Sequence, residues 1–256
     1  MNPIKVERFK SRRRQRMTMG FGCFAVMGTG MVFLCALLYA TGLLTTIVLG
    51  ILGVRNIGET DTLFEVTPVP TTAVQNINNQ SLVIFDMGAY GEERLDTDPE
   101  SITFVTGDDE VGNRVASVGF SEAGLLQLCR DRSPVCANGD GQYRNAYIDL
   151  RPNGAIVFVD INAGVFWQQV GIVLQLNDSR TVMRVVGVDI NGSTYDPATL
   201  PQFLPAEARQ SILNALTEVE TVVNDLLQDI IVRNAGKNYR IDDVQIDNER
   251  LTLLMR

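Results

Sequence analysis

The stretch PAEARQSILNALTEVETVVNDLLQDIIVR, residues 205–233, decides the fold of the C-terminal part of the chain. Its apolar residues recur at alternating spacings of four and three, which places them on one face of a helix. This seam consists of Ile212, Leu216, Val219, Val223, Leu226 and Ile230. Pro205 suits a helix start, and Gly236 is expected to end a helix that reaches Arg233. Such a helix would be about 42 Å long and needs a large apolar surface to cover.

Segments on both sides of this helix have the pattern of strands that could supply that surface. Apolar and polar residues alternate along 165–176 and 180–190, which is the period of a half-buried strand. The apolar face holds Phe166, Val170, Ile172, Leu174 and Leu176 in the first strand, and Val182, Val186, Val188 and Ile190 in the second. Further strands are expected at 82–85, 102–105, 114–120, 146–150, 155–161, 239–246 and 250–255. The sequence therefore predicts an α+β domain in which a curved antiparallel sheet packs on one long helix.

The pattern leaves open whether helix and sheet close completely. A filled core is the usual outcome when an amphipathic helix covers a sheet. The alternative is an elongated apolar groove between them, which could hold a ligand. On this alternative the candidate ligand-binding residues are Phe166, Trp167, Leu216, Val223 and Leu226.

At the other end of the chain, a run without any charged residue, 17–54, follows a basic tail, 1–16. About 20 apolar residues cross a bilayer, and a signal-peptide core has only roughly 7–15. We therefore predict an uncleaved, single-pass transmembrane helix in the cell membrane. The tail carries seven basic residues and one acidic residue, so the positive-inside rule places it in the cytoplasm and the C-terminal domain outside. One long span and a helical hairpin remain open alternatives.

Small residues recur every four positions within this run, at Gly42, Thr46 and Gly50. They share one helix face, which allows another transmembrane helix to approach closely. They are candidate helix-packing residues, although Gly and Thr are also common in membrane helices in general.

The region beyond the membrane run divides into a predicted linker, 55–80, and one domain, 81–256. The linker is rich in Thr, Pro and Asn, a composition typical of semi-extended spacers. The domain contains Cys129 and Cys136, separated by a short polar segment with one proline. In an oxidising exterior compartment these two cysteines are expected to form a disulfide. Two free thiols are the alternative.

Composition excludes several kinds of site. The chain has no histidine, which excludes Ser-His and Cys-His nucleophile pairs and histidine-bearing zinc sites. Lys237 is the one lysine outside the basic tail. The net charge is −8 for the chain and +6 for the tail, which leaves −14 for the rest. Because phosphates attract positive charge, an acidic exterior domain argues against nucleic acid as a partner. We predict no enzyme activity, no cofactor and no metal.

The order of these elements resembles a known family. The resemblance rests on the order of five features. These are the end of a strand and the start of a helix around FSEAGLL, 120–126, the hairpin 145–161, the long strands, one long helix, and the ending YRIDDVQIDNERLTL, 239–253. This order is similar to that of small bacterial membrane-anchored domains distantly related to the tubular lipid-binding superfamily. The resemblance covers roughly 114–256 and implies a curved sheet wrapped on a long helix around an apolar tunnel for lipid tails. It supplies no ligand motif that transfers residue by residue.

Two functions follow as expectations. The first is a membrane-anchored, non-enzymatic binding domain for a lipid or other hydrophobic ligand. The alternative is a single-span accessory or structural subunit of a larger membrane complex, whose partners would be the transmembrane helices of other subunits. The apolar seam and the family resemblance favour the first, and the small-residue face favours the second.

The predicted topology can be tested by labelling single cysteines in intact cells. In a chain with Cys23 and Cys35 replaced by serine, a Lys5→Cys variant should resist an impermeant thiol reagent, because the tail is cytoplasmic. A Thr71→Cys variant should react. Both should react after the cells are permeabilised. Labelling of Lys5→Cys but not Thr71→Cys in intact cells would contradict the topology.

Overall fold

The computed structural model describes residues 43–64, 74–86, 88, 91–137, 141–162, 167–200 and 206–256. Within the predicted transmembrane run it describes one nine-residue helix, α2 (Leu43–Ile51). Among the residues that the structure describes, no helix is both long and apolar enough to cross a membrane. The transmembrane prediction thus rests on residues that lie mostly outside the described part. From Val54 onward the described residues belong to one compact unit.

The first sheet of this unit has six antiparallel strands in the order β1-β11-β10-β9-β8-β7. Its strands are β1 (Asn56–Glu59), β7 (Tyr143–Arg151), β8 (Gly154–Asn162), β9 (Trp167–Leu176), β10 (Met183–Ile190) and β11 (Ser193–Tyr195). The hairpin between β7 and β8 turns at Asn153, which has a positive φ of 62°. Asparagine tolerates this conformation better than most residues, which suits it to the turn.

The second sheet has eight antiparallel strands in the order β2-β5-β6-β14-β13-β12-β3-β4. Its strands are β2 (Gln75–Asn79), β3 (Leu82–Asp86), β4 (Glu92–Asp96), β5 (Ile102–Asp108), β6 (Arg114–Ser121), β12 (Ile231–Asn234), β13 (Lys237–Ile246) and β14 (Arg250–Met255). The three C-terminal strands, β12 to β14, therefore lie in the middle of this sheet, between β6 and β3, which come earlier in the chain.

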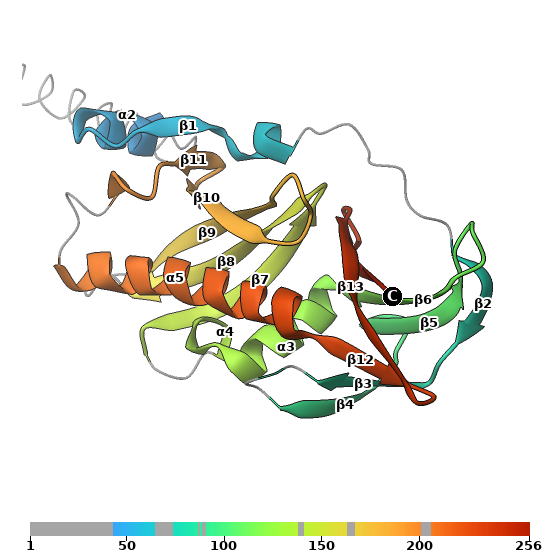
Figure 1. Cartoon of the computed structure of the whole chain (residues 1–256). Coiled ribbons are helices and arrows are strands. Elements are labelled where there is room, and N and C mark those ends of the chain that lie inside the picture. Colours follow the sequence, from blue (N-terminus) through green and yellow to red (C-terminus); the bar gives the residue numbers. More distant parts are fainter. Residues whose placement is uncertain are drawn as a thin grey trace, which may run out of the picture. The chain divides into compact units, whose positions relative to one another are not determined.

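In the described part of this unit, the α-helices beside the sheets are α3 (Glu122–Arg132), α4 (Pro134–Ala137) and α5 (Ala206–Asp229). The long helix α5 lies obliquely across the strands of the first sheet, with α3 and α4 near its C-terminal half (Figure 1). Ser121 caps α3 and accepts a hydrogen bond from the backbone N–H of Gly124, as the sequence predicts. The fold is α+β with a strongly curled antiparallel sheet and one long helix, which confirms that part of the predicted fold class.

The long helix ends earlier than predicted. It stops at Asp229, and 231–234 forms β12, which pairs with both β13 and β3. Residues 230–232 are the β-branched run Ile-Ile-Val, which favours a strand over a helix. The expected helix stop at Gly236 is instead a hairpin turn. Ala235 and Gly236 both have positive φ, 48° and 77°, as a two-residue hairpin loop requires.

The face assignment of β10 also differs from the prediction. A bulge between Val185 and Gly187 inserts Val186 as an extra residue. Val188 pairs with Ile172 on the face toward α5, whereas Val186 packs on the opposite face, against the cluster around Phe64. A strict period of two cannot anticipate such a bulge, because it reverses the side of every residue that follows.

The predicted linker, 55–80, contains regular structure at both of its ends. Strand β1 pairs with β11, and a 3-10 helix, η1 (Thr60–Phe64), follows it. Phe64 is 4% exposed and packs on Ile156 and Val173, so η1 covers the face of the first sheet that points away from α5. We call this face the outer face. The Pro-Thr stretch within 65–73 lies outside the described residues.

The contribution of Phe64 can be measured directly. Phe64→Ala should lower the free energy of unfolding of the full chain by about 3–5 kcal/mol, because it removes a buried ring and leaves a cavity. Ile57→Ala, in the same segment but 43% exposed, should change it by no more than about 0.5 kcal/mol. Fluorescence of Trp167, the chain's one tryptophan, would follow chemical denaturation. Equal effects of the two variants would show that η1 is not part of the core.

Candidate functional site

A cavity of about 100 Å³ lies where the C-terminal half of α5 meets both sheets and α3. Strands from both sheets and two helices contribute to its wall. The lining residues are Phe85, Phe120, Leu125, Leu128, Cys129, Ser133, Ile148, Ala155, Val157, Leu174, Met183, Val219, Val222, Val223, Leu226, Leu227, Ile230, Leu251 and Leu253. No side chain in this described lining is ionisable apart from Cys129, whose thiol is in a disulfide.

The disulfide helps to build one wall of the cavity. Cys129 on α3 is joined to Cys136 on α4, with their Cα atoms 5.6 Å apart, as the sequence predicts. Ser133 lies between the two helices, and its hydroxyl accepts a hydrogen bond from the backbone N–H of Val135. The closed loop holds the end of α3 against the cavity.

Two polar contacts fasten α5 to the first sheet. The Tyr143 hydroxyl on β7 donates to the carbonyl of Ser211 at 2.8 Å. In the C-terminal part of α5, the Asn224 amide accepts from the backbone N–H of Met183 at 2.9 Å and donates to its carbonyl at 2.8 Å. The helix is thus tied to both β7 and β10. The cavity lies beside the turns that surround and follow Asn224.

The predicted ligand-binding residues separate into groups. Val223 and Leu226 lie in the cavity wall and are partly exposed. Leu216 is buried but lines a different, open groove together with Val185 and Pro197. Trp167 is partly buried at the start of β9, where the Arg144 guanidinium lies 4.2 Å from the centre of its ring. Phe166 lies outside the described residues.

The predicted helix-packing face is described only in part. Gly42 lies outside the described residues, whereas Thr46 and Gly50 both belong to α2. A Cβ atom added at Gly50 would meet no other atom within 4 Å. The proposed contact with another transmembrane helix therefore stays a prediction.

Sequence reasoning missed the cavity wall that comes from the second sheet. Phe85 on β3 and Phe120 on β6 stack with ring centres 5.9 Å apart, and both line the cavity. Their strands are far apart in sequence and are joined through β14, β13 and β12. The sequence shows only that each phenylalanine lies near the end of a predicted strand. This does not predict that the two rings are in contact.

A second hollow, of about 240 Å³, lies on the outer face of the first sheet beside η1. We call it the outer cleft. It is lined by Thr60, Asp61, Arg151, Ile156, Phe158, Gln169, Val170, Gly171, Asp189, Asn191 and Gly192. It is separate from the apolar cavity, because the two share no lining residue.

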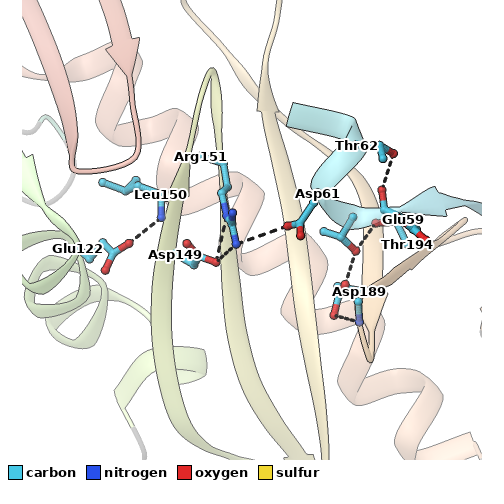
Figure 2. A network of polar contacts seen from close by, with 11 residues as sticks. Glu59, Asp61, Thr62, Glu122, Asp149, Leu150, Arg151, Asp189 and Thr194 are labelled. Carbon is cyan, nitrogen blue, oxygen red and sulfur yellow. Dashed lines mark hydrogen bonds and ion pairs between the residues drawn. The ribbon is translucent and has the colours of Figure 1, made fainter. Parts of the chain in front are cut away.

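Asp189 is the buried charge of the outer cleft, with 5% of its surface exposed. Its carboxylate accepts hydrogen bonds from the Thr60 hydroxyl and from the backbone N–H of Gly192 (Figure 2). The hydroxyls of Thr60 and Thr194 are themselves 2.9 Å apart. Burial raises the pKa of Asp189 above its ordinary value, and the nearby charge of Asp61 acts in the same direction, while the two hydrogen bonds oppose it.

Arg151 stands on the other side of the outer cleft. Its guanidinium is 2.8 Å from the carboxylate of Asp149 and 3.5 Å from that of Asp61 (Figure 2). Asp61 comes from η1, so this pair and the Thr60–Asp189 bond both attach η1 to the sheet. The guanidinium of Arg151 is therefore paired within the protein, and the carboxylate of Asp189 accepts two hydrogen bonds from neutral donors.

Comparisons with known proteins identify no relative. No protein-family model matches the chain, and neither curated proteins nor solved structures give a significant match. The two sites are thus described from their own geometry.

The raised pKa of Asp189 predicts a pH dependence of stability. Because the folded state disfavours its ionised form, stability is lost as pH rises from about 4, the unfolded pKa, through the higher folded pKa. In Asp189→Asn the amide can donate to Thr60 and its oxygen can accept from Gly192, so the contacts are kept. The variant should gain stability relative to the wild type as pH rises from 4 to 7, measured by denaturation of the full chain. A constant difference across this range, or one of opposite sign, would contradict this.

Proposed function

We propose that this chain is a membrane-anchored, non-enzymatic binding protein for a lipid or other hydrophobic ligand. The observation that carries the proposal is the apolar cavity beside α5, which the protein's own side chains leave unfilled. The hydroxyl of Ser133 belongs to its described lining, but no ionisable side chain in that lining could activate it as a nucleophile. The anchor is the uncharged run 17–54, behind the basic tail.

The energetics favour a ligand in this cavity. A void in a protein core costs about 24 cal/mol per Å³, so a cavity of about 100 Å³ costs roughly 2 kcal/mol. Water does not offset this cost, because an apolar cavity gives it no hydrogen-bond partner. An apolar group that enters recovers the lost contacts.

The size of the cavity limits what enters it. An engineered apolar cavity of about 150 Å³ binds benzene, so a cavity of about 100 Å³ accepts a few carbon atoms of a larger molecule. We infer that the end of an acyl chain enters here. Val223 and Leu226 are partly exposed, so the remainder of the ligand would leave past them. This arrangement agrees with the resemblance to the tubular lipid-binding superfamily, which we retain as part of the proposal.

Substitution of a cavity residue provides the test. The Val223→Trp side chain should fill the cavity and reduce co-purifying lipid, measured by solvent extraction and mass spectrometry of the full chain. Thr217→Trp is the matched control, because Thr217 is exposed on α5 and does not line the cavity. Lipid bound around the membrane segment should be the same in both variants.

The expected result is about one lipid per chain that is present in the wild type and in Thr217→Trp but lost from Val223→Trp. Identical lipid content in all three, with both variants folded, would contradict the proposal. It would leave the accessory-subunit function as the better explanation. If Val223→Trp fails to fold, the smaller change Val223→Leu should still lower the lipid content.

A further inference from the structure

One aromatic ring, that of Phe158, lines the outer cleft, and the lipid proposal does not use it. Tyr147, Phe158, Gly171 and Asp189 are cross-strand neighbours on β7, β8, β9 and β10, and they form one row across the outer face. The rings of Tyr147 and Phe158 stack with centres 4.7 Å apart and planes 18° apart. Tyr147 is 42% exposed, so this ring pair borders solvent at the edge of the sheet.

Gly171 has no side chain, which leaves space between its neighbours in this row. A Cβ atom there would lie 2.8 Å from the Phe158 ring and 2.9 Å from the Cβ of Asp189. The Phe158 ring therefore lies close to Gly171 on one side, and the Asp189 side chain lies close to it on the other. Together with Thr60 and Asp61 of η1, they enclose the outer cleft of about 240 Å³.

The charged side chains around the outer cleft already have partners within the protein. Arg151 pairs with Asp149 and Asp61, and Asp189 is held by Thr60 and Gly192. An anionic ligand would meet three carboxylates, those of Asp61, Asp149 and Asp189, beside one guanidinium. A neutral ligand that carries hydroxyls can bind without breaking these contacts, because carboxylate oxygens keep further lone pairs and a guanidinium keeps further N–H groups.

The side chain that remains free for recognition in the outer cleft is neutral and has both hydrogen-bond donors and an acceptor. The Gln169 side chain is exposed at the cleft and makes no hydrogen bond within the described part of the chain, so its amide can donate and accept.

We propose that the outer cleft binds a neutral sugar unit, with the Phe158 ring against one face of the sugar and Gln169 bonded to its hydroxyls. Hydroxyls both donate and accept, which matches the carboxylates, guanidinium and amides around the cleft. The C–H face of a pyranose ring is apolar and packs on an aromatic ring. This site goes beyond the lipid proposal and does not depend on it.

The experiment uses the full chain in a detergent without a sugar headgroup. The probes are glucose, galactose, mannose and N-acetylglucosamine, with sorbitol as an acyclic polyol control and lysine as a charged control. Binding is titrated by saturation-transfer NMR at low and high salt. At least one sugar should bind saturably and independently of salt, whereas sorbitol and lysine should not bind.

Variants connect this binding to the outer cleft. Gln169→Ala and Phe158→Leu should each weaken sugar binding at least about tenfold, equivalent to one lost hydrogen bond or ring contact. Gln168→Ala is the matched control, because Gln168 is the neighbouring glutamine on β9 and does not line the cleft. It should bind like the wild type. Gln169 is exposed, so its variant tests the proposal even if Phe158→Leu is unstable.

Three results would overturn the proposal. The first is that none of the four sugars binds. The second is that sorbitol or lysine binds as well as the sugars, which would indicate unspecific or ionic recognition. The third is that folded Gln169→Ala binds as tightly as Gln168→Ala, which would place the sugar elsewhere.

Discussion

The structure depends on the contact between the apolar seam of α5 and a sheet that is wider than one helix. A helix with its side chains is about 10–12 Å across, whereas six strands spaced about 4.8 Å apart span roughly 24 Å. The sheet curls, and α3 and the second sheet cover part of what α5 leaves bare. The apolar cavity lies at the junction of these elements, where no one side chain reaches across.

The same sheet also has to bury part of its outer face. Residues 170–174 of β9 are all buried, although successive side chains point to opposite faces. The segment before the second sheet provides the cover, through Phe64 on the apolar side and the Thr60–Asp189 bond on the polar side. Beyond η1 the cover ends, and the outer cleft remains. Each hollow is thus found where a covering element is too narrow for the sheet beneath it.

Much of this fold could be predicted from local patterns. The cap at Ser121, the hairpin after Arg151 and the final pair of strands all follow from signals a few residues long. The end of α5 could not be predicted in this way. The apolar seam of the helix continues to Ile230, and residues from Ile231 onward form a strand because they pair with β3. Strand β4 has the charged sequence Glu-Glu-Arg-Leu-Asp, which shows no apolar face because it lies at a sheet edge.

The sites were less predictable than the fold. Val223 and Leu226 of the helix seam line the cavity, whereas Leu216, on the same seam, lines a different groove. Periodicity identifies a face and does not say which part of that face meets a neighbour. Phe85 and Phe120 reach the cavity only through the pairing order of the second sheet. The outer cleft depends on η1, within a range whose composition is typical of a linker.

The most direct measurement of the central claim is photo-crosslinking of the full chain with a fatty acid that carries a diazirine near its methyl end. Mass spectrometry of the digested protein would locate the label. The account predicts labelling of cavity residues such as Met183 on β10 and Leu226 on α5, with competition by unlabelled fatty acid. Label confined to the membrane run, with none on these strands and helices, would contradict it.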